Sequence, residues 1–542
     1  MNRSGMSVLR SIRFRSAMLG ITFGMAFGLA AMTAGQGAAA AQSVLRIAMT
    51  AADIPDWRGQ PDQGFEGNRF VGFSLYDTLI EWDLSSREKE VGLRPGLATS
   101  WSIDPADHKK WIFNLREGVK FHDGCDWNAA AAVWNFERLT SDKHPAFTPY
   151  NFGRARSRTN NIDRVEKTGD YQVAFYTKTP ESLFHFNMPF LFMLSPCAVE
   201  KAGNNLDVFA KAPSGTGPYK FVSAVPRERL ELAKNDDYWD KNRIPKHDRL
   251  VLLPMPEATT RVAALLSGQV DFIEAPPPDA IPALKAAKMQ IVTNIYPHTW
   301  PYILNVARGP FKDIRVRQAA NWAVNRQEMV DLLSGLAQPS SGIYVPQQKY
   351  YGKPVEYGFD QKKATALLKE AGCYPCEIMI GISTSGSGQM QPLPMNELVK
   401  EQLEAVGFKV KFDTVDWNTL LDVYFKGQEK FPYDGVNFSS GATDPLNFLK
   451  GSMTKYKGPV GTNWGWYSNP KVDELAETAL NSFDPAVWEP IVTQIHEILV
   501  NEARNLFIVS DLNPRAMSPR VKGFVQAQSW FQDITPITVD PK

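Results

Sequence analysis

Histidine is the side chain in this sequence best suited to acid–base or metal chemistry near neutral pH. Seven are present: His108, His122, His144, His185, His247, His298 and His496. His496-Glu497 is not followed by the second histidine of an H-E-x-x-H zinc motif. The sequence contains no G-x-S-x-G, and Gly352-Lys353 is followed by Pro354 instead of the Ser or Thr of a phosphate-binding loop. We therefore predict no catalytic residue, no metal ligand and no cofactor, although a dispersed active site would leave no such signature.

His122 and Asp123 are adjacent and suggest a His/Asp dyad at first sight. Successive side chains of a strand point to opposite faces, so neighbours do not readily meet in one site. The segment Phe121-His122-Asp123-Gly124 is predicted to be a connection from a strand to a turn.

The four cysteines include a C-x-x-C pair, Cys373-Tyr-Pro-Cys376. A zinc site would need two further ligands at similar spacing, and none is near. A thioredoxin-like motif would begin a helix after a strand, whereas here a predicted helix at 364–371 precedes the pair and a strand at 377–382 follows it. We predict a small structural disulfide, with free thiols as the alternative; Cys125 and Cys197 could form a second bridge.

The first 41 residues have the pattern of a secretory signal peptide. They contain no lysine or acid and four arginines, Arg3, Arg10, Arg13 and Arg15. An apolar, small-residue run at 17–34 follows, and then Ala38–Ala41 before Gln42, an A-x-A type cleavage site. The alternative is a single membrane anchor, but the small residues favour cleavage. We expect a soluble mature protein, beginning at or near Gln42, in the periplasm.

The charge balance argues against nucleic-acid binding. The net charge is +1, and it becomes −3 without the four arginines. A nucleic-acid binder would instead show a basic stripe.

Predicted strands and helices alternate along the rest of the chain, which is typical of an α/β protein with mixed sheets flanked by helices. Strands are expected at 44–50, 111–115, 171–177, 377–382 and 409–415. Helices are expected at 128–139, 258–266, 314–333, 358–372, 393–406, 471–480 and 486–502.

Several motifs, in order, resemble those of the large extracellular solute-binding proteins of peptide- and nickel-type ABC importers, known as family 5. The most specific stretch is 93–139, which contains Leu93-Arg-Pro-Gly-Leu-Ala-Thr-Ser-Trp101 and Trp111-Ile-Phe-Asn-Leu-Arg-Glu-Gly-Val-Lys-Phe-His-Asp-Gly124. Further matches are Gly215-Thr-Gly-Pro-Tyr-Lys-Phe221, Asn235-Asp-Asp-Tyr-Trp239, 263–271, 316–326, 359–372 and Asp444-Pro445. The resemblance covers about 44–524.

This resemblance implies a two-lobed periplasmic-binding-protein fold of type II, in its large form with an extra subdomain. The implied division is 1–41 signal peptide, 42–87 lobe I, 88–209 extra subdomain, 210–304 lobe I, 305–509 lobe II and 510–542 lobe I. The chain would cross between lobes near Leu304-Asn305 and near Ser510-Asp511. A ligand would be engulfed in the cleft as the hinge closes.

Both charged anchors of a zwitterionic peptide are missing from the expected positions. In peptide-binding relatives an aspartate four residues before the proline of the Asp-Pro loop holds the ligand's amine; here that position is Gly441. The loop expected to hold a carboxylate-binding arginine, Thr384–Met390, is uncharged. An unpaired buried charge is costly. Ordinary short peptides are therefore not the expected ligands.

The predicted ligand-binding residues combine aromatic platforms with the Asp-Pro loop. Trp57 and Trp417 each follow a predicted strand, and Phe438 offers a flat apolar surface. The full set is Trp57, Tyr150, Met188, Trp417, Phe438, Ser439, Ser440, Gly441, Thr443 and Asp444. Arg154, Arg156 and Arg158 are predicted to lie in a solvated loop, with recognition of an anionic ligand as the alternative.

The predicted function is ligand capture for an ABC importer. The expected partners are a peptide-like, opine-like, sugar or aromatic small molecule and the permease subunits in the inner membrane; we expect a monomer that binds no nucleic acid. The alternatives are an exported hydrolase and a chemoreceptor or chaperone-like binder on the same fold.

Overall fold

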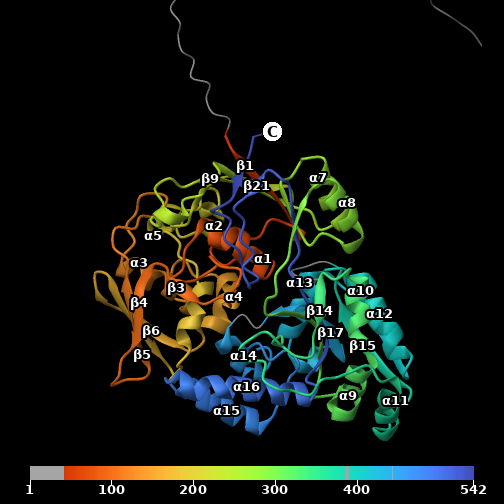
Figure 1. The fold of residues 1–542 in the computed structure, drawn as a ribbon. Helices are drawn as coiled ribbons and strands as arrows, with labels where there is room; N and C mark the ends of the chain where they lie inside the picture. Colours follow the sequence, from red (N-terminus) through yellow and green to blue (C-terminus); the bar gives the residue numbers. More distant parts are fainter. Residues whose placement is uncertain (1–41, 385–389, 442–443, 542) are drawn as a thin grey trace, which may run out of the picture. The chain divides into compact units, whose positions relative to one another are not determined.

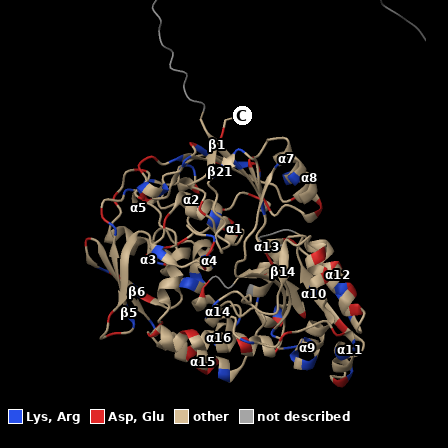
Figure 2. Ribbon diagram, in the orientation of Figure 1, with Lys and Arg blue, Asp and Glu red and all other residues tan. Residues whose placement is uncertain are grey.

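The computed structural model describes residues 42–384, 390–441 and 444–541 (Figure 1). Within this part of the chain, three sheets carry most of the strands. No helix among the described residues combines the length and apolar character needed to cross a bilayer. Basic and acidic side chains are interspersed on helices such as α11, α12 and α15 (Figure 2), in keeping with the near-zero net charge.

The first sheet has seven strands in the order β12-β20-β11-β1-β10-β9-β8. The central strand β1 pairs in parallel with β10 and β11, and the remaining pairs are antiparallel, so the sheet is mixed. Its strands are β1 Val44–Met49, β8 Tyr219–Val225, β9 Arg229–Lys234, β10 Arg249–Pro254, β11 Phe272–Glu274, β12 Gln290–Val292 and β20 Arg515–Met517. The helices joined to it are α1 Phe65–Gly67, α2 Phe73–Leu75, α7 Ala258–Leu266 and α8 Ile281–Ala286.

The second sheet also has seven strands, in the order β14-β19-β13-β17-β15-β16 with β18 paired to β13. Its strands are β13 His298–Leu304, β14 Ala337–Pro339, β15 Cys376–Ile382, β16 Phe408–Thr414, β17 Gly435–Asn437, β18 Ser440–Gly441 and β19 Asn505–Asp511. The helices of this part are α9 Ile314–Ala323, α10 Arg326–Leu332, α11 Gln361–Glu370, α12 Pro392–Glu404, α13 Trp417–Phe425, α14 Pro445–Ser452, α15 Pro470–Asn481 and α16 Pro485–Asn501.

A third, antiparallel sheet of four strands, β4-β5-β7-β6, is formed by the segment inserted between β1 and β8. Its strands are β4 Ala98–Ile103, β5 Lys110–Leu115, β6 Ile162–Gly169 and β7 Gln172–Thr177. Its helices are α3 Ala129–Thr140, α4 Pro149–Thr159, α5 Pro196–Lys201, α6 Leu206–Phe209 and the 3₁₀ helix η2 Phe184–Phe190. Two-stranded pairs complete the fold: β2 Ile80–Trp82 with β3 Leu93–Pro95, and β21 Val521–Lys522 with β22 Thr538–Val539.

Polar caps explain where several helices begin. Asn128 accepts a hydrogen bond from the Ala131 amide at the start of α3, and Asp360 caps α11 through the Lys363 amide. The single helix predicted over 314–333 is wrong: it is divided into α9 and α10. The backbone is extended at Val324 and Asn325, and Asn325 then caps the second helix.

Arg154, Arg156 and Arg158 lie in a helix, so the predicted loop is wrong. Thr148 caps α4 by accepting from the Asn151 amide, and Pro149 occupies its first turn, where its missing N–H costs nothing.

The Phe121–Gly124 segment lies between β5 and α3 and hydrogen-bonds to the turn before β8, and no dyad forms. His122 Nε2 lies 2.9 Å from the Gly217 carbonyl oxygen. Asp123 accepts hydrogen bonds from the hydroxyls of Ser195 and Ser214, each at 2.9 Å. The turn that carries Gly217 packs closely against the backbone at Leu75. A Cβ on Gly217 would lie 2.6 Å from the Leu75 carbonyl carbon, so only glycine allows the two backbones to come this close.

Both disulfides considered from the sequence are present. Cys373 and Cys376 are joined across three residues, and Cys125 and Cys197 across 72. The second bridge ties the strand–turn segment before α3 to α5.

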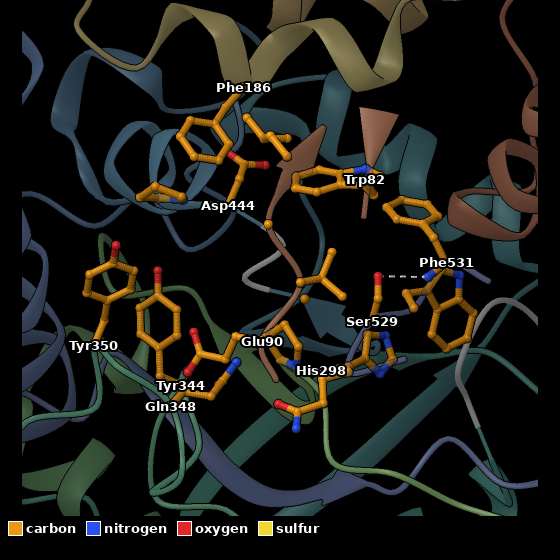
Figure 3. Close-up of a pocket in the computed structure, with 18 of the residues that line it drawn as sticks. Trp82, Glu90, Phe186, His298, Tyr344, Gln348, Tyr350, Asp444, Ser529 and Phe531 are labelled. Carbon is orange, nitrogen blue, oxygen red and sulfur yellow. Dashed lines mark hydrogen bonds between the residues drawn. The ribbon is translucent and has the colours of Figure 1, made fainter. Parts of the chain in front are cut away.

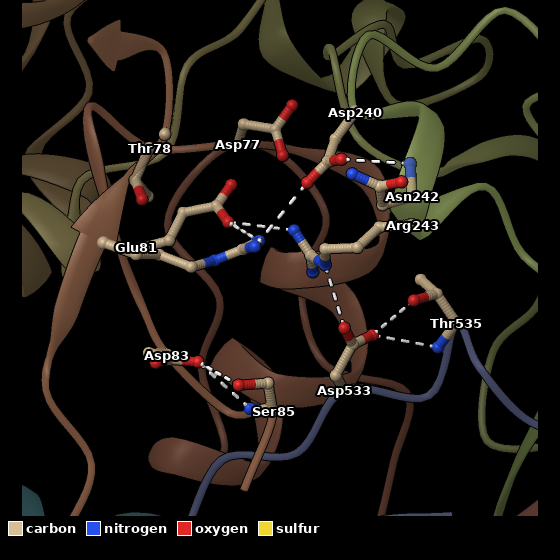
Figure 4. Close-up of polar contacts among 12 residues, drawn as sticks. Asp77, Thr78, Glu81, Asp83, Ser85, Asp240, Asn242, Arg243, Asp533 and Thr535 are labelled. Atoms are coloured by element: carbon tan, nitrogen blue, oxygen red, sulfur yellow. Dashed lines mark hydrogen bonds and ion pairs between the residues drawn. The ribbon is translucent and has the colours of Figure 1, made fainter. Parts of the chain in front are cut away.

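A buried charge network holds the C-terminal segment against the N-terminal one (Figure 4). Arg243 donates to Glu81 at 2.9 Å and to Asp533 at 2.8 Å. Asp77, deep in the same region, accepts hydrogen bonds from Thr216, Tyr238 and Trp239. Burial, with the nearby Glu81 charge, raises the pKa of Asp77 to about 7.

Two short connections join the first and second sheets. The chain passes from β12 to β13 between Val292 and His298, and returns from β19 to β20 between Asp511 and Arg515. The expected first crossing near Leu304-Asn305 falls at the end of β13, which is already paired to β17 and β19. The second crossing follows Asp511 directly.

Candidate ligand-binding site

A cavity of about 340 Å³ lies between segments attached to all three sheets (Figure 3). This volume is within the range of small-molecule sites. The lining residues are Trp82, Glu90, Val91, Gly92, Leu93, Trp101, His185, Phe186, Pro297, His298, Tyr344, Gln348, Tyr350, Gly441, Asp444, Pro445, Gln528, Ser529, Trp530 and Phe531.

Aromatic side chains form a large part of the cavity wall. Phe531 is stacked on Trp82, with ring centroids 6.2 Å apart and planes 14° apart. The Trp530 ring is stacked on His298 at 4.7 Å. The Phe531 backbone amide donates to the Ser529 hydroxyl at 3.1 Å, which fixes the turn that presents both rings (Figure 3). Such a wall offers large apolar faces to a ligand at little conformational cost.

Trp530 also separates this cavity from a smaller one of about 40 Å³. The Arg69 guanidinium lies over the Trp530 ring, 4.4 Å from its centroid, and forms an ion pair with Glu274. Arg515 is 3.2 Å from the same carboxylate. Nearby, burial and the charge of Glu274 raise the pKa of Glu66 to about 7. This buried charge cluster fixes the position of Trp530.

The two connections between the first and second sheets meet at the cavity. His298 begins β13 and Asp511 ends β19, and the His298 Nδ1 lies 2.9 Å from the Asp511 Oδ2. Tyr296 donates from its hydroxyl to Asp511 Oδ1 at 2.6 Å. All three side chains are buried. The polar group therefore ties both crossing segments together beside the ligand space.

Two carboxylates line the cavity. Asp444 caps α14 by accepting from the Asn447 amide at 2.6 Å, and its other oxygen is 3.4 Å from Arg158 on α4. Glu90, in the connection between β2 and β3, accepts from the backbone amide of Lys349 at 2.8 Å. Each contact joins a segment of the inserted region or first sheet to one of the second-sheet part.

His496 holds the loop that carries Tyr344, Gln348 and Tyr350. Its Nε2 accepts from the amides of Ile343 and Tyr344 at 3.0 and 3.2 Å. Its Nδ1 donates to the Tyr351 carbonyl at 2.8 Å. Because the ring is fully buried, desolvation lowers its pKa to about 4, so it is neutral in this role.

Of the predicted site residues, Gly441 and Asp444 line the cavity. Ser440 is beside them in β18, opposite Thr299, and Ser439 precedes it and is buried. Thr443 lies outside the described residues.

Other predicted residues pack elsewhere in the described structure. Trp417 and Phe438 pack edge to face with centroids 6.0 Å apart, in a separate aromatic cluster. Trp57 donates from its indole to the Ala210 carbonyl. Met188 is fully buried in the core of the third sheet, and Tyr150 lies under the Arg154 guanidinium. These five are not among the cavity-lining residues.

Sequence reasoning missed most of the lining. Trp82 ends β2, whereas Tyr344 and Trp530 lie in connections, and the three residues are far apart in sequence. The Trp530-Phe531 pair, which follows the last crossing between sheets, was the available signal. Among the described residues no group of three or more His, Cys, Asp or Glu side chains is placed to hold a metal ion.

Comparisons with known proteins agree with this architecture. Residues 92–469 match the model of the "Bacterial extracellular solute-binding proteins, family 5 Middle". A glutathione-binding protein GsiB of Pectobacterium atrosepticum is 29% identical over 91% of this chain and 93% of its own length. The GsiB of Escherichia coli is 31% identical over 84% of this chain and 86% of its own.

Solved structures share the fold. The periplasmic binding protein DppA of Helicobacter pylori, in complex with the peptide STSA, has a TM-score of 0.78 and 24% identity, covering 92% of this chain and 99% of that one. The predicted two-lobed α/β fold with mixed sheets is therefore confirmed. The chain belongs to family 5 of the bacterial extracellular solute-binding proteins.

Proposed function

We propose that this protein captures a small organic ligand in the 340 Å³ cavity and delivers it to the importer's permease. The observation that carries this proposal is that residues attached to all three sheets line one cavity at the point where both connecting segments meet. A ligand bound there contacts both lobes at once, so it stabilises the closed arrangement over an open one.

Contacts across the two lobes support a closing mechanism. Lys450 on α14 is 3.0 Å from Glu181 of the inserted region, and both side chains are buried. The Ser182 amide donates to the Leu480 carbonyl at 2.7 Å. Together with Asp444–Arg158 and Glu90–Lys349, these contacts would be broken on opening. Their free energy supplements that of the ligand in the closed form.

The ligand we propose is not an ordinary zwitterionic short peptide. Position 441 is glycine and lines the cavity, and the lining contains neither lysine nor arginine to pair with a carboxylate. Glutathione, the ligand for which the GsiB relatives are named, carries two carboxylates and one amine. The same lining disfavours it here, because a carboxylate would be desolvated beside Glu90 and Asp444.

The residues proposed to contact the ligand are Gly441 and Asp444 from the sequence prediction, with Trp82, Tyr344 and Trp530 added from the cavity lining. Trp57, Tyr150, Met188, Trp417, Phe438, Ser439, Ser440 and Thr443 stay predictions whose effect on binding is open to mutational test.

For the lobe division we propose the six segments expected from the sequence, with the first crossing moved to the connection between β12 and β13. We further propose that the arginine-rich N-terminal segment is removed at or near Gln42, leaving a monomer in the periplasm. Family 5 members are solute-binding proteins, and we propose that this chain likewise releases its ligand unchanged.

Native mass spectrometry of the protein purified from periplasm tests the capture function. We expect a mass excess from a co-purified small molecule, lost on mild denaturation, and a rise in melting temperature when that molecule is added back. Capture would be contradicted if no small molecule co-purifies and no member of a broad metabolite library raises the melting temperature. Conversion of the bound molecule over hours would support the hydrolase alternative.

A further inference from the structure

The charged groups in the cavity wall are of one sign. The lining residues, all within the described part of the chain, include the carboxylates of Glu90 and Asp444 but neither lysine nor arginine. Arg158 lies 3.4 Å from Asp444 and offsets its charge. The hydrogen bond given for Glu90 comes from the backbone amide of Lys349, which carries no net charge. Glu90 is exposed and forms no ion pair with a described lysine or arginine, so its negative charge is available to a ligand in the cavity.

Tyr344 adds a second polar group at the same corner. Its side chain is 3% exposed, and its hydroxyl has no hydrogen-bond partner among the described residues. Burial, and then the charges of Tyr350, Asp444 and Glu90, raise its pKa, so the phenol stays neutral. In Figure 3 the Tyr344 hydroxyl, the Glu90 carboxylate and the Gln348 side chain lie on one side of the cavity. An unpaired buried hydroxyl is costly unless a ligand satisfies it.

The remaining surface suits a cation. Trp82, Tyr350 and Trp530 place aromatic rings around the space. Aromatic faces attract ammonium groups, and the attraction is stronger where the cation is desolvated. A protonated amine also has three N–H donors, so it can donate to a carboxylate such as that of Glu90 and to a phenol oxygen such as that of Tyr344. An anionic group placed there would meet the Glu90 charge, while Arg158, the cation beside the cavity, is already paired with Asp444.

From this arrangement we infer that the ligand carries a protonated amine and no anionic group, and that Glu90 is the residue that selects it. The inference rests on the proposed function, because it names the ligand class of that same cavity. The amine site is on the connection between β2 and β3, on a different element from Gly441, where the acid of peptide-binding relatives was expected.

Calorimetry tests this with probes that share an aromatic ring and a two-carbon linker but differ in the charge of the end group. One series is 2-phenylethylamine, 2-phenylethanol and 3-phenylpropionate. The other is tryptamine, tryptophol and indole-3-propionate. The proteins are wild type, Glu90→Gln and the control Glu88→Gln. The Glu90→Gln variant keeps a side-chain oxygen for the Lys349 amide, so the contact between the lobes is retained. Glu88 is exposed, bonds to Ser86 and does not line the cavity.

For wild type and Glu88→Gln we expect the amine of at least one series to bind about tenfold more tightly than its alcohol, with no binding of the anion. Glu90→Gln should bind amine and alcohol equally, with the alcohol affinity unchanged within about twofold. An alcohol or anion that binds as well as its amine, an unchanged preference in Glu90→Gln, or an absence of amine binding in both series would overturn the inference. Those results leave capture itself intact, because the library screen and native mass measurement decide it separately.

Discussion

The His298 imidazole and the Asp511 carboxylate lie 2.9 Å apart at the two places where the chain passes between its two large sheets. Each residue is at the end of a strand next to a connection, and the pair also receives the Tyr296 hydroxyl. The position of one hinge strand is thereby fixed relative to the other, directly beside the ligand space.

Asp511→Ala should destabilise the protein by about 1–3 kcal/mol, because it removes the acceptor that the buried Tyr296 hydroxyl and His298 ring share. Chemical denaturation measures this change. Asp207→Ala is the matched control: its carboxylate is 76% exposed and pairs with Arg58 at the surface, so its loss should change stability little. Equal stability of Asp511→Ala and wild type would show that the hinge pair has no structural role.

The two disulfides should differ in their effect on stability. The Cys125–Cys197 bridge closes a loop of 72 residues, and its removal should cost about 4 kcal/mol by loop-closure entropy. The Cys373–Cys376 bridge spans three residues, so its removal should cost about 2 kcal/mol or less and leave ligand binding nearly unchanged. Melting of the two double-serine variants compares them. A larger loss from the 373/376 variant would be the opposite of the expected order.

Acid should loosen the loop held by His496. The pKa of this ring is lowered to about 4 by burial, below the ordinary value of 6.5. Between these pH values the unfolded chain binds a proton at His496 that the folded protein does not. The contribution of neutral His496 to the free energy of unfolding is therefore fully present above pH 6.5 and is lost as the pH falls toward 4. The loss is about 1.4 kcal/mol for each pH unit in that window.

Glu66 and Asp77 act in the opposite direction, because their pKa values are raised to about 7 and the folded protein keeps their protons over the same window. The test therefore compares how the free energy of unfolding changes with pH in wild type, His496→Gln and the exposed control His108→Gln. Wild type and His108→Gln should share a steeper decline below pH 6.5 than His496→Gln. Parallel curves for all three proteins would exclude His496 as the sensitive group.

Trp530 and Trp417 should separate ligand binding from core packing. Trp530→Ala removes a cavity wall and should weaken ligand affinity by about 1–3 kcal/mol. Trp417→Ala should lower the melting temperature with little change in affinity, because its ring packs against Phe438 in a separate cluster. Calorimetry with the ligand found by native mass spectrometry provides the comparison, and a greater affinity loss from Trp417→Ala would restore the aromatic platform predicted from the sequence.

The elements of the fold were predictable where the local pattern was strong. The 258–266 helix has an apolar face and ends before Gly268, and the structure gives Ala258–Leu266. The break between α9 and α10 was missed because the apolar spacing continues through Val324 while Asn325 starts a new cap. The arginines at 154–158 were placed in a loop because the Pro149 start and Thr148 cap were not recognised.

The cavity was less predictable for a different reason. Gly441 and Asp444 belong to a recognisable loop, and both line it. Glu90, Tyr344 and Trp530 come together only through the packing of connections separated by hundreds of residues. No local spacing encodes that meeting. Trp417 is an aromatic residue that follows a strand, which is why the sequence predicts it as a ligand platform. In the structure its side chain packs against Phe438 instead.

A crystal structure of the protein with its bound ligand shows directly where the ligand lies. We expect ligand density in the 340 Å³ cavity, against Trp82 and Trp530, with a ligand nitrogen within hydrogen-bond distance of Glu90. Density located in the Trp417–Phe438 cluster or outside the segments joining the two large sheets, with this cavity filled by water alone, would contradict it.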